Sequence, residues 1–277
     1  MKHTEGHFTS QKGFRLFYQC WLPDGDPRAM LLVAPGLAEH SGRYGNLLDY
    51  FVPRGLAVCG LDYRGHGRSE GLRCHIDSFP EYVDDLRSFS EIVHDGHETK
   101  KPFLVGHSMG ATIAAAFAVR CQDRLSGLIV SCVTLEAGAS VSAGMKLAAR
   151  VLSLLAPRIG VSVIDASTIS RDQAVVDAYA NDPLVYRGKI RARLGAELLK
   201  TIDELHSQVA EITLPILIMH GTADRLSDPE GSRVLYERVG SRDKTLKLYE
   251  GFYHEIFNEP EHRQVMADVE AWLAARI

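Results

Sequence analysis

The sequence predicts an α/β fold: a doubly wound, mostly parallel sheet flanked by helices and carrying a helical insertion. Short apolar runs alternate along the chain with helix-like stretches. Most of these runs lack a polar residue at every second position, which is typical of parallel strands buried on both faces. One long region, 135–205, contains helical patterns and no clear strand.

The expected elements follow from these patterns in chain order. A stretch at 14–18 alternates charged and apolar residues, which predicts an antiparallel strand at the sheet edge. Six apolar runs are expected to form the other strands: 30–34, 56–59, 103–105, 128–130, 216–219 and 246–249. Helices are expected at 80–94, 111–120 and 260–275.

The region 135–205 is expected to be a helical cap or lid, inserted between a first core part at 1–134 and a second at 206–277. Within it, 145–155 is apolar almost all round, and Lys146, Arg150 and Ser153 form a narrow polar stripe at helical spacing. Two interpretations stay open for this segment. It is either a lid helix that meets lipid or a helix packed on the core.

Composition excludes several classes of protein. The chain is 45% hydrophobic and 24% charged, as ordinary folded domains are. Its net charge of −4, with no basic block, argues against a nucleic-acid partner. No apolar run is long enough to span a membrane, and the N-terminus lacks a secretory pattern, so a cytoplasmic location is expected. No glycine-rich nucleotide motif is present, and oligomeric state is not determined.

The five cysteines are expected to be structural. They are odd in number, scattered and without a CxxC pair, so neither a disulfide framework nor a zinc site is expected. Cys59 and Cys132 lie in apolar runs and are interpreted as small core residues.

The strongest chemical signal is the pentapeptide GHSMG at 106–110, between an expected strand and an expected helix. A serine on such a sharp turn has strained backbone angles, and bulky residues at Gly106 or Gly110 would collide with neighbouring chain. The turn exposes the hydroxyl of Ser108 and places a helix N-terminus beneath the reacting centre. Ser108 is therefore the expected nucleophile, and this chemistry needs no cofactor or metal.

A serine nucleophile needs a base, and the chain offers twelve histidines. His254 follows the last expected strand, where parallel strands deliver loops to the active edge. His107 is expected to point away from the serine, and His220 to brace the turn after its strand. His40 and His66, in earlier loops, remain weaker candidates.

Two carboxylates compete for the role of orienting the base. Asp224 lies in the loop that leaves the strand at 216–219. Asp228 lies four residues on, before Pro229, where it could start a helix as an N-cap. We therefore prefer Asp224, and the resulting order Ser, Asp, His is the one used by hydrolases of this architecture.

The oxyanion of an acyl-transfer intermediate needs hydrogen-bond donors. One expected donor is the amide of Met109, next to the nucleophile. The other is expected from the loop 35–40 after an early strand, and we choose the amide of Leu37.

Together these segments resemble the monoacylglycerol lipase branch of the α/β-hydrolase family, which is lysophospholipase-like. The matching segments are EHSGRY at 39–44, RGHGRS at 64–69, GHSMG at 106–110, HGTADRL at 220–226 and YHE at 253–255. The resemblance implies an eight-stranded sheet with a helical cap and a triad of Ser108, Asp224 and His254. It also implies hydrolysis of long-chain monoacylglycerols to fatty acid and glycerol.

One position departs from the family pattern. The family usually opens the oxyanion loop with His-Gly, whereas this chain has Pro35 and Gly36. Proline removes an amide and stiffens the loop, so the substrate range near it is left open. Glu39 and Arg43 beside this loop are candidates for a polar headgroup contact or an ordinary surface pair. The glycine-rich stretch 62–67 is interpreted as a structural turn.

The predicted partner is a lipid ester, cleaved through an acyl-enzyme on Ser108. In the cap, Leu147, Val151 and Leu152, with Met145 and Leu155, are expected to shelter the acyl chain or contact a membrane surface. A general carboxylesterase or lysophospholipase would use the same triad. A serine aminopeptidase and a catalytically silent binding module remain alternatives, and Ser108 argues against epoxide hydrolase chemistry.

Overall fold

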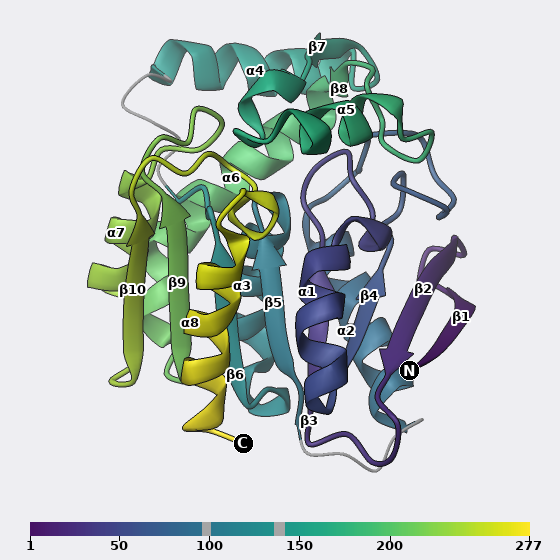
Figure 1. The fold of residues 1–277 in the computed structure, drawn as a ribbon. Coiled ribbons are helices and arrows are strands. Elements are labelled where there is room, and N and C mark those ends of the chain that lie inside the picture. The colour runs from purple at the N-terminus through teal and green to yellow at the C-terminus, as the bar shows by residue number, and fades with distance from the viewer. Residues whose placement is uncertain (96–100, 136–141) are drawn as a thin grey trace.

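An eight-stranded sheet runs through the centre of the computed structural model, which describes residues 1–95, 101–135 and 142–277 (Figure 1). Its order is β1-β2-β4-β3-β5-β6-β9-β10. The first two strands are antiparallel, and the other six run parallel. The strands are β1 Lys2–Thr9, β2 Arg15–Leu22, β3 Ala29–Ala34, β4 Leu56–Leu61, β5 Phe103–His107, β6 Gly127–Ser131, β9 Ile216–Gly221 and β10 Lys244–Tyr249. The predicted fold class is confirmed.

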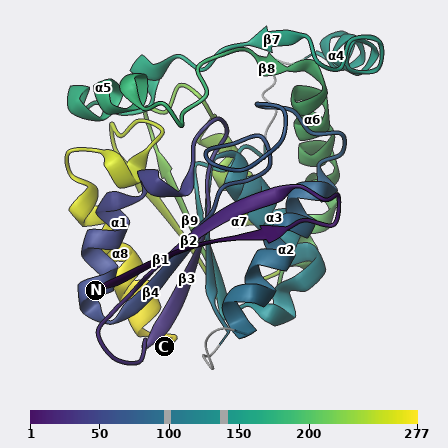
Figure 2. The same cartoon turned by 90° about the vertical axis from the view of Figure 1, so that its right-hand side faces the viewer.

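Helices cover both faces of this sheet (Figure 2). On one face lie α1 (Gly45–Phe51) and α8 (His262–Ala274), and on the other lie α2 (Pro80–Asp95), α3 (Met109–Cys121) and α7 (Glu230–Arg238). Each face has its own apolar core. Short 3₁₀ turns occur at Ser41–Arg43, Val52–Arg54, Gln122–Arg124, Ala166–Thr168, Val209–Glu211 and Ile256–Asn258.

Between β6 and β9, the chain makes an excursion over the carboxyl ends of the parallel strands (Figure 1). This insertion contains α4 (Ala143–Leu155), α5 (Gln173–Asn181) and α6 (Ala192–Gln208). It also contains two short strands, β7 (Gly160–Ser162) and β8 (Ile190–Arg191), which pair antiparallel. The expectation of a strand-free region is therefore wrong, because two- and three-residue strands are too short to show a periodic pattern.

Helix α4 turns its apolar side chains outward. Its polar stripe partly faces α6, where Lys146 Nζ donates to Asp203 Oδ1 at 2.7 Å, and Ser153 is buried. The leucines at its C-terminal end, Leu154 and Leu155, are 71% and 81% exposed. The helix packs on α6 rather than against the sheet, so the interpretation as an ordinary core helix does not fit.

A disulfide joins Cys20 of β2 to Cys59 of β4. The two residues lie directly opposite each other in the antiparallel pairing of these strands. The expectation that the cysteines are unbridged is wrong for this pair, since the register that brings them together cannot be deduced from spacing. Cys74, Cys121 and Cys132 are free. None of the helices in the described residues is long and apolar enough to cross a bilayer.

Candidate active site

Ser108 occupies the sharp turn between β5 and α3. Its φ of 54° and ψ of −120° are values that non-glycine residues rarely adopt. A Cβ atom added at Gly106 would lie 2.6 Å from the carbonyl oxygen of Gly110, and one at Gly110 would lie 1.9 Å from that of Ala34. Both positions therefore require glycine, as the motif predicts, and the strained serine is held in place by its neighbours.

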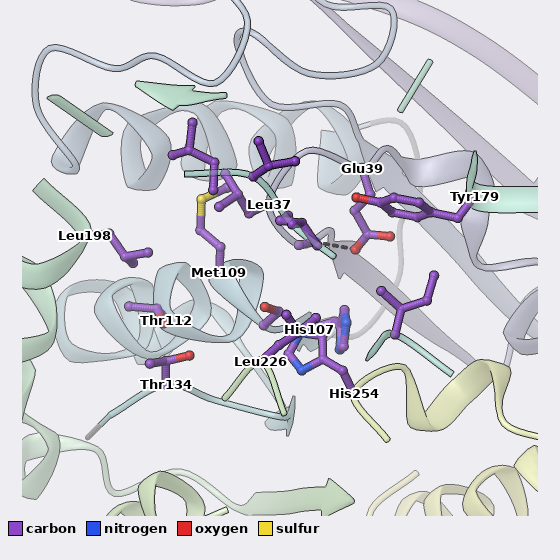
Figure 3. A pocket seen from close by; sticks show the side chains of 16 residues that line it. Leu37, Glu39, His107, Met109, Thr112, Thr134, Tyr179, Leu198, Leu226 and His254 are labelled. Carbon is purple, nitrogen blue, oxygen red and sulfur yellow. Dashed lines mark hydrogen bonds between the residues drawn. The ribbon is translucent and has the colours of Figure 1, made fainter. Parts of the chain in front are cut away.

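A cavity of about 290 Å³ opens at this turn, between the sheet edge and the insertion (Figure 3). Ser108 and His254 both line it, so segments far apart in sequence meet here. Glu39 and Tyr179 lie at one side of the cavity, and Thr112, Thr134 and Leu198 lie at the other (Figure 3).

Asp224 and His254 are joined by a short hydrogen bond. His254 Nδ1 lies 2.6 Å from Asp224 Oδ2, and since a carboxylate only accepts, the hydrogen lies on Nδ1. The other carboxylate oxygen accepts from the amides of Leu226 and Ser227. Burial alone would raise the pKa of Asp224, but hydrogen bonds from His220 and His254 hold it well below its usual range. The carboxylate thus stays ionised beside the imidazole.

Two of the rival histidines have other partners. His40 Nε2 bonds Asp182 Oδ2 of the insertion at 2.8 Å, and buried His66 bonds the carbonyl of Arg64.

The other two histidines lie near the expected triad. His107, expected to point away from the serine, lines the cavity, with its ring centroid 4.8 Å from that of His254 (Figure 3). His220 contacts the loop after its strand, as expected, through the Asp224 side chain and the Ser227 carbonyl.

The amides of Leu37 and Met109 are free. Both residues line the Ser108 cavity, and neither amide has a hydrogen-bond partner within the described residues. The Met109 amide begins α3, where the first-turn N–H groups of a helix are unsatisfied. Two unpaired donors beside one serine can bind a developing negative charge.

The Glu39 and Arg43 side chains are both nearly buried and do not form an exposed surface pair. Glu39 lines the cavity and accepts from the Gly36 amide and the Tyr44 hydroxyl. Burial raises the pKa of Glu39 above its usual range, although Arg43 opposes the shift.

Arg43 is not among the cavity-lining residues. Its guanidinium forms a two-point ion pair with Glu255, at 2.6 and 2.9 Å. It also lies 4.6 Å from the ring centroid of Tyr179.

The three insertion residues expected to touch substrate lie apart from Ser108. Leu147 and Val151 line a shallow groove on the outer side of α4. Leu152 lines that groove and also a second apolar cavity of about 460 Å³. This second cavity shares Leu37, Ile190 and Leu198 with the first, so the two adjoin.

Sequence reasoning missed several cavity residues, among them Tyr179, Ile169 and Leu198. They belong to the insertion, and no sequence signal marks them as cavity residues. Apolar residues on amphipathic helices carry no signal that separates cavity lining from ordinary packing.

Comparisons with known proteins agree with this geometry. The profile of the Hydrolase_4 family, described as "Serine aminopeptidase, S33", matches residues 25–261. The chain is 40% identical to "Monoacylglycerol lipase" of Mycolicibacterium smegmatis, over 99% of this chain and 98% of that protein. It is 35% identical to "Monoglyceride lipase" of Homo sapiens, covering 98% and 90%. The crystal structure of Paleococcus ferrophilus monoacylglycerol lipase superposes with a TM-score of 0.83 at 31% identity, covering both chains completely.

Proposed function

Since the chain belongs to the serine aminopeptidase S33 family of α/β-hydrolases, within the group that holds the monoacylglycerol lipases, we propose that it is a serine lipase that hydrolyses monoacylglycerols to fatty acid and glycerol. One arrangement carries the proposal. A strained serine, a histidine bound to a buried aspartate and two free amides meet at one cavity that adjoins an apolar one.

The reaction proceeds by two acyl transfers. His254 takes the proton of Ser108 as the hydroxyl attacks the ester carbonyl, and the amides of Leu37 and Met109 bind the oxyanion. His254 then protonates the departing glycerol, and Ser108 holds the acyl group. Water, activated by His254, releases the fatty acid. Asp224 fixes the imidazole tautomer and stabilises its positive charge.

The two sides of the cavity suit the two parts of the substrate. The Glu39 carboxylate and the Tyr179 side chain form the polar side, which fits a glycerol headgroup. Arg43, outside the cavity lining, contacts both Glu39 and Tyr179. The acyl chain extends past Leu198 into the apolar cavity beneath α4. In this assignment residues 135–205 are the cap of the enzyme.

We propose that the cap also rests on a lipid surface. Of twelve large apolar side chains that are exposed in the described residues, nine lie between 145 and 163. The ranges 142–164 and 186–196 together hold seven basic residues and no acidic one. Among the described residues, only Lys146 and Arg193 of these have acidic partners. An apolar helix with unpaired cations around it fits an anionic membrane surface. A cytoplasmic location stays a prediction.

The substrate assignment is tested by hydrolysis of a monoacylglycerol series beside triacylglycerol, lysophospholipid and short p-nitrophenyl esters. We expect preference for monoacylglycerol, and near-complete loss of turnover in the Ser108→Ala variant, with its fold unchanged by circular dichroism. Turnover of short esters alone would make the protein a general carboxylesterase. Turnover of lysophospholipid alone would make it a lysophospholipase.

A fluorophosphonate probe separates these enzymes from a binding module. We expect the wild-type protein to react at Ser108 and the Ser108→Ala variant to remain unlabelled. An unlabelled wild-type protein would contradict the proposed function.

A further inference from the structure

The aspartate of the proposed triad binds two histidines through one oxygen. Asp224 Oδ2 lies 2.6 Å from His254 Nδ1 and 3.1 Å from His220 Nε2. Because a carboxylate oxygen can only accept, both nitrogens carry hydrogen. The His220 side chain, at the carboxyl end of β9, is fully buried. Its contact with Asp224 is therefore shielded from solvent.

A serine on α7 completes this chain of hydrogen bonds. Ser232 is fully buried, and its Oγ lies 2.7 Å from His220 Nδ1. A neutral imidazole has one N–H. In His220 it lies on Nε2 and donates to Asp224, so Nδ1 accepts a hydrogen bond from the Ser232 hydroxyl. The hydroxyl of Ser232 thus selects the tautomer of His220 that can donate to the carboxylate.

The Asp224 carboxylate also accepts hydrogen bonds from other donors, which differ from His220. The amides of Leu226 and Ser227 hold Oδ1 at 2.8 and 3.1 Å. On Oδ2, besides the two histidines, the Ser227 hydroxyl donates at 2.9 Å. Because the imidazole nitrogens within 3.3 Å of that hydroxyl both carry hydrogen, its single proton has two acceptors, the Asp224 carboxylate and the Cys132 carbonyl at 3.2 Å. His220 is the donor whose direction is fixed by a partner behind it.

We propose that His220 is a positioning residue of the hydrolase reaction. Held in one tautomer by Ser232, it orients the Asp224 carboxylate and takes a share of its negative charge, which sets how strongly Asp224 favours the protonated form of His254. The role rests on the proposed function, because it needs the triad of Ser108, Asp224 and His254.

The other titratable groups near Asp224 and His254 do not share the role of His220. From β5, the His107 ring centroid lies 4.8 Å from that of His254 in a tilted arrangement, and burial, followed by the charge of His254, holds the pKa of His107 well below its usual range. After β6, the Cys132 thiol lies within 4.8 Å of an Asp224 carboxylate oxygen and of a His254 ring nitrogen, and burial raises its pKa well above its usual range. Glu255, next to His254, is neutralised by Arg43, which is also paired with Glu39. Near neutral pH, His107 and Cys132 are therefore uncharged.

The test measures kcat/KM for a soluble p-nitrophenyl ester against pH. In His220→Leu the carboxylate loses a donor, so its charge acts more strongly on His254 and favours the imidazolium. We expect kcat/KM at its optimum to fall about tenfold and the acid limb to move up by about half a pH unit. His220→Gln, which keeps a donor near the Nε2 position, should stay within about threefold of wild type.

Ser232→Ala gives a second, milder test, since it removes the hydroxyl and leaves the imidazole. We expect the same direction of pH shift with a smaller loss. The matched control is Ser10→Ala, which removes another buried serine in the turn after β1 and should leave the profile unchanged. A uniform loss at every pH, with the acid limb unmoved in both His220→Leu and Ser232→Ala, would reduce His220 to a packing residue.

Fluorophosphonate labelling keeps the two proposals apart. Labelled wild-type protein with an unshifted profile in the variants overturns only the role of His220. An unlabelled wild-type protein overturns the proposed function itself. If His220→Leu does not fold, the Ser232→Ala profile decides.

Discussion

Asp224 and Asp228 stand four positions apart in one loop, and their surroundings give them different roles. The Asp224 side chain is fully buried and bonds His254 at 2.6 Å. Asp228 is exposed, and its Oδ1 accepts from the amide of Glu230, the first residue of α7, at 2.9 Å. The same carboxylate is thus a proposed catalytic orienter at one position and a helix cap at the other.

Substitution separates these roles. Asp224→Asn puts a donor where His254 needs an acceptor, which favours the wrong tautomer, so we expect kcat to fall by about 10⁴-fold. Asp228→Ala removes only the cap and should lower the free energy of unfolding by about 1 kcal/mol with kcat unchanged. Steady-state kinetics and urea unfolding measure both. An inactive Asp228→Ala beside an active Asp224→Asn would transfer the catalytic role to Asp228.

At the scale of elements, α4 and the small β7–β8 sheet form one outer surface of the insertion (Figure 1). Gly160 of β7 pairs with Arg191 of β8, and the Arg191 guanidinium donates to the carbonyl of Arg158. A Cβ at Gly160 would lie 2.3 Å from that of Lys189. The three cations therefore gather beside the exposed apolar residues of β7, such as Val161.

Vesicle sedimentation tests this surface. We expect tighter binding to vesicles containing phosphatidylglycerol than to phosphatidylcholine alone, and weaker binding as salt increases. The double substitution Leu154→Ser with Leu155→Ser should weaken binding at least about tenfold, since each buried leucine contributes about 1.5–3 kcal/mol. Lys189→Glu should reduce the preference for anionic vesicles.

The matched control is Arg242→Glu. Arg242 is an exposed cation just before β10, at the amino end of that strand, whereas the insertion lies over the carboxyl ends of the parallel strands. The Arg242→Glu variant should bind as wild type does. Equal binding to neutral and anionic vesicles would contradict the role of the cations, and unchanged binding of the double leucine variant would contradict that of α4. Hydrolysis of a short soluble ester should persist in all three variants.

At the scale of the whole molecule, charged contacts hold one side of the insertion to the core. His40 bonds Asp182 of the insertion, and Arg171 of the insertion pairs with Glu259 and Glu261 beyond the His254 loop. The backbone amide of Glu255 donates to the carbonyl of Ile169 at 2.7 Å. These contacts lie around the polar side of the cavity, whereas α4 is held through α6.

The stability of the whole chain should depend on pH through His66. Burial, followed by the charge of Arg73, lowers its pKa from 6.5 to about 4, against a hydrogen bond to the Arg64 carbonyl. Below pH 6.5 the unfolded chain binds a proton that the folded chain does not, so stability is complete above that pH and is lost as the pH falls toward 4.

We expect this one group to cost about 3 kcal/mol of unfolding free energy between neutral pH and the lower end of that window. Urea unfolding at a series of pH values measures the slope. His66→Phe should flatten it, whatever its effect on absolute stability. An equal slope in the variant would assign the acid sensitivity to other groups.

Local sequence patterns predicted most of the strands of the central sheet. Each of the six runs proved to be a strand of the parallel sheet. Five of these strands are buried on both faces, so their runs are apolar throughout, whereas the edge strand β10 is partly exposed and includes Lys247. Strand β1 was missed, since its residues are mostly polar and it is an edge strand paired only with β2. Strands β7 and β8 were missed because they are too short for periodicity.

The sequence by itself determined the elbow at Ser108, since its glycines are required by close backbone contacts within and beside one turn. Order along the chain, with the capping preference of Asp228, selected the Asp224 that the structure places against His254. Only the tertiary structure decided what meets across long separations: Cys20 with Cys59, Arg43 with Glu255, and His220 with Asp224 and Ser232. Strand register and the docking of the insertion set those contacts, and both depend on packing of the whole chain rather than on the spacing of residues within a segment.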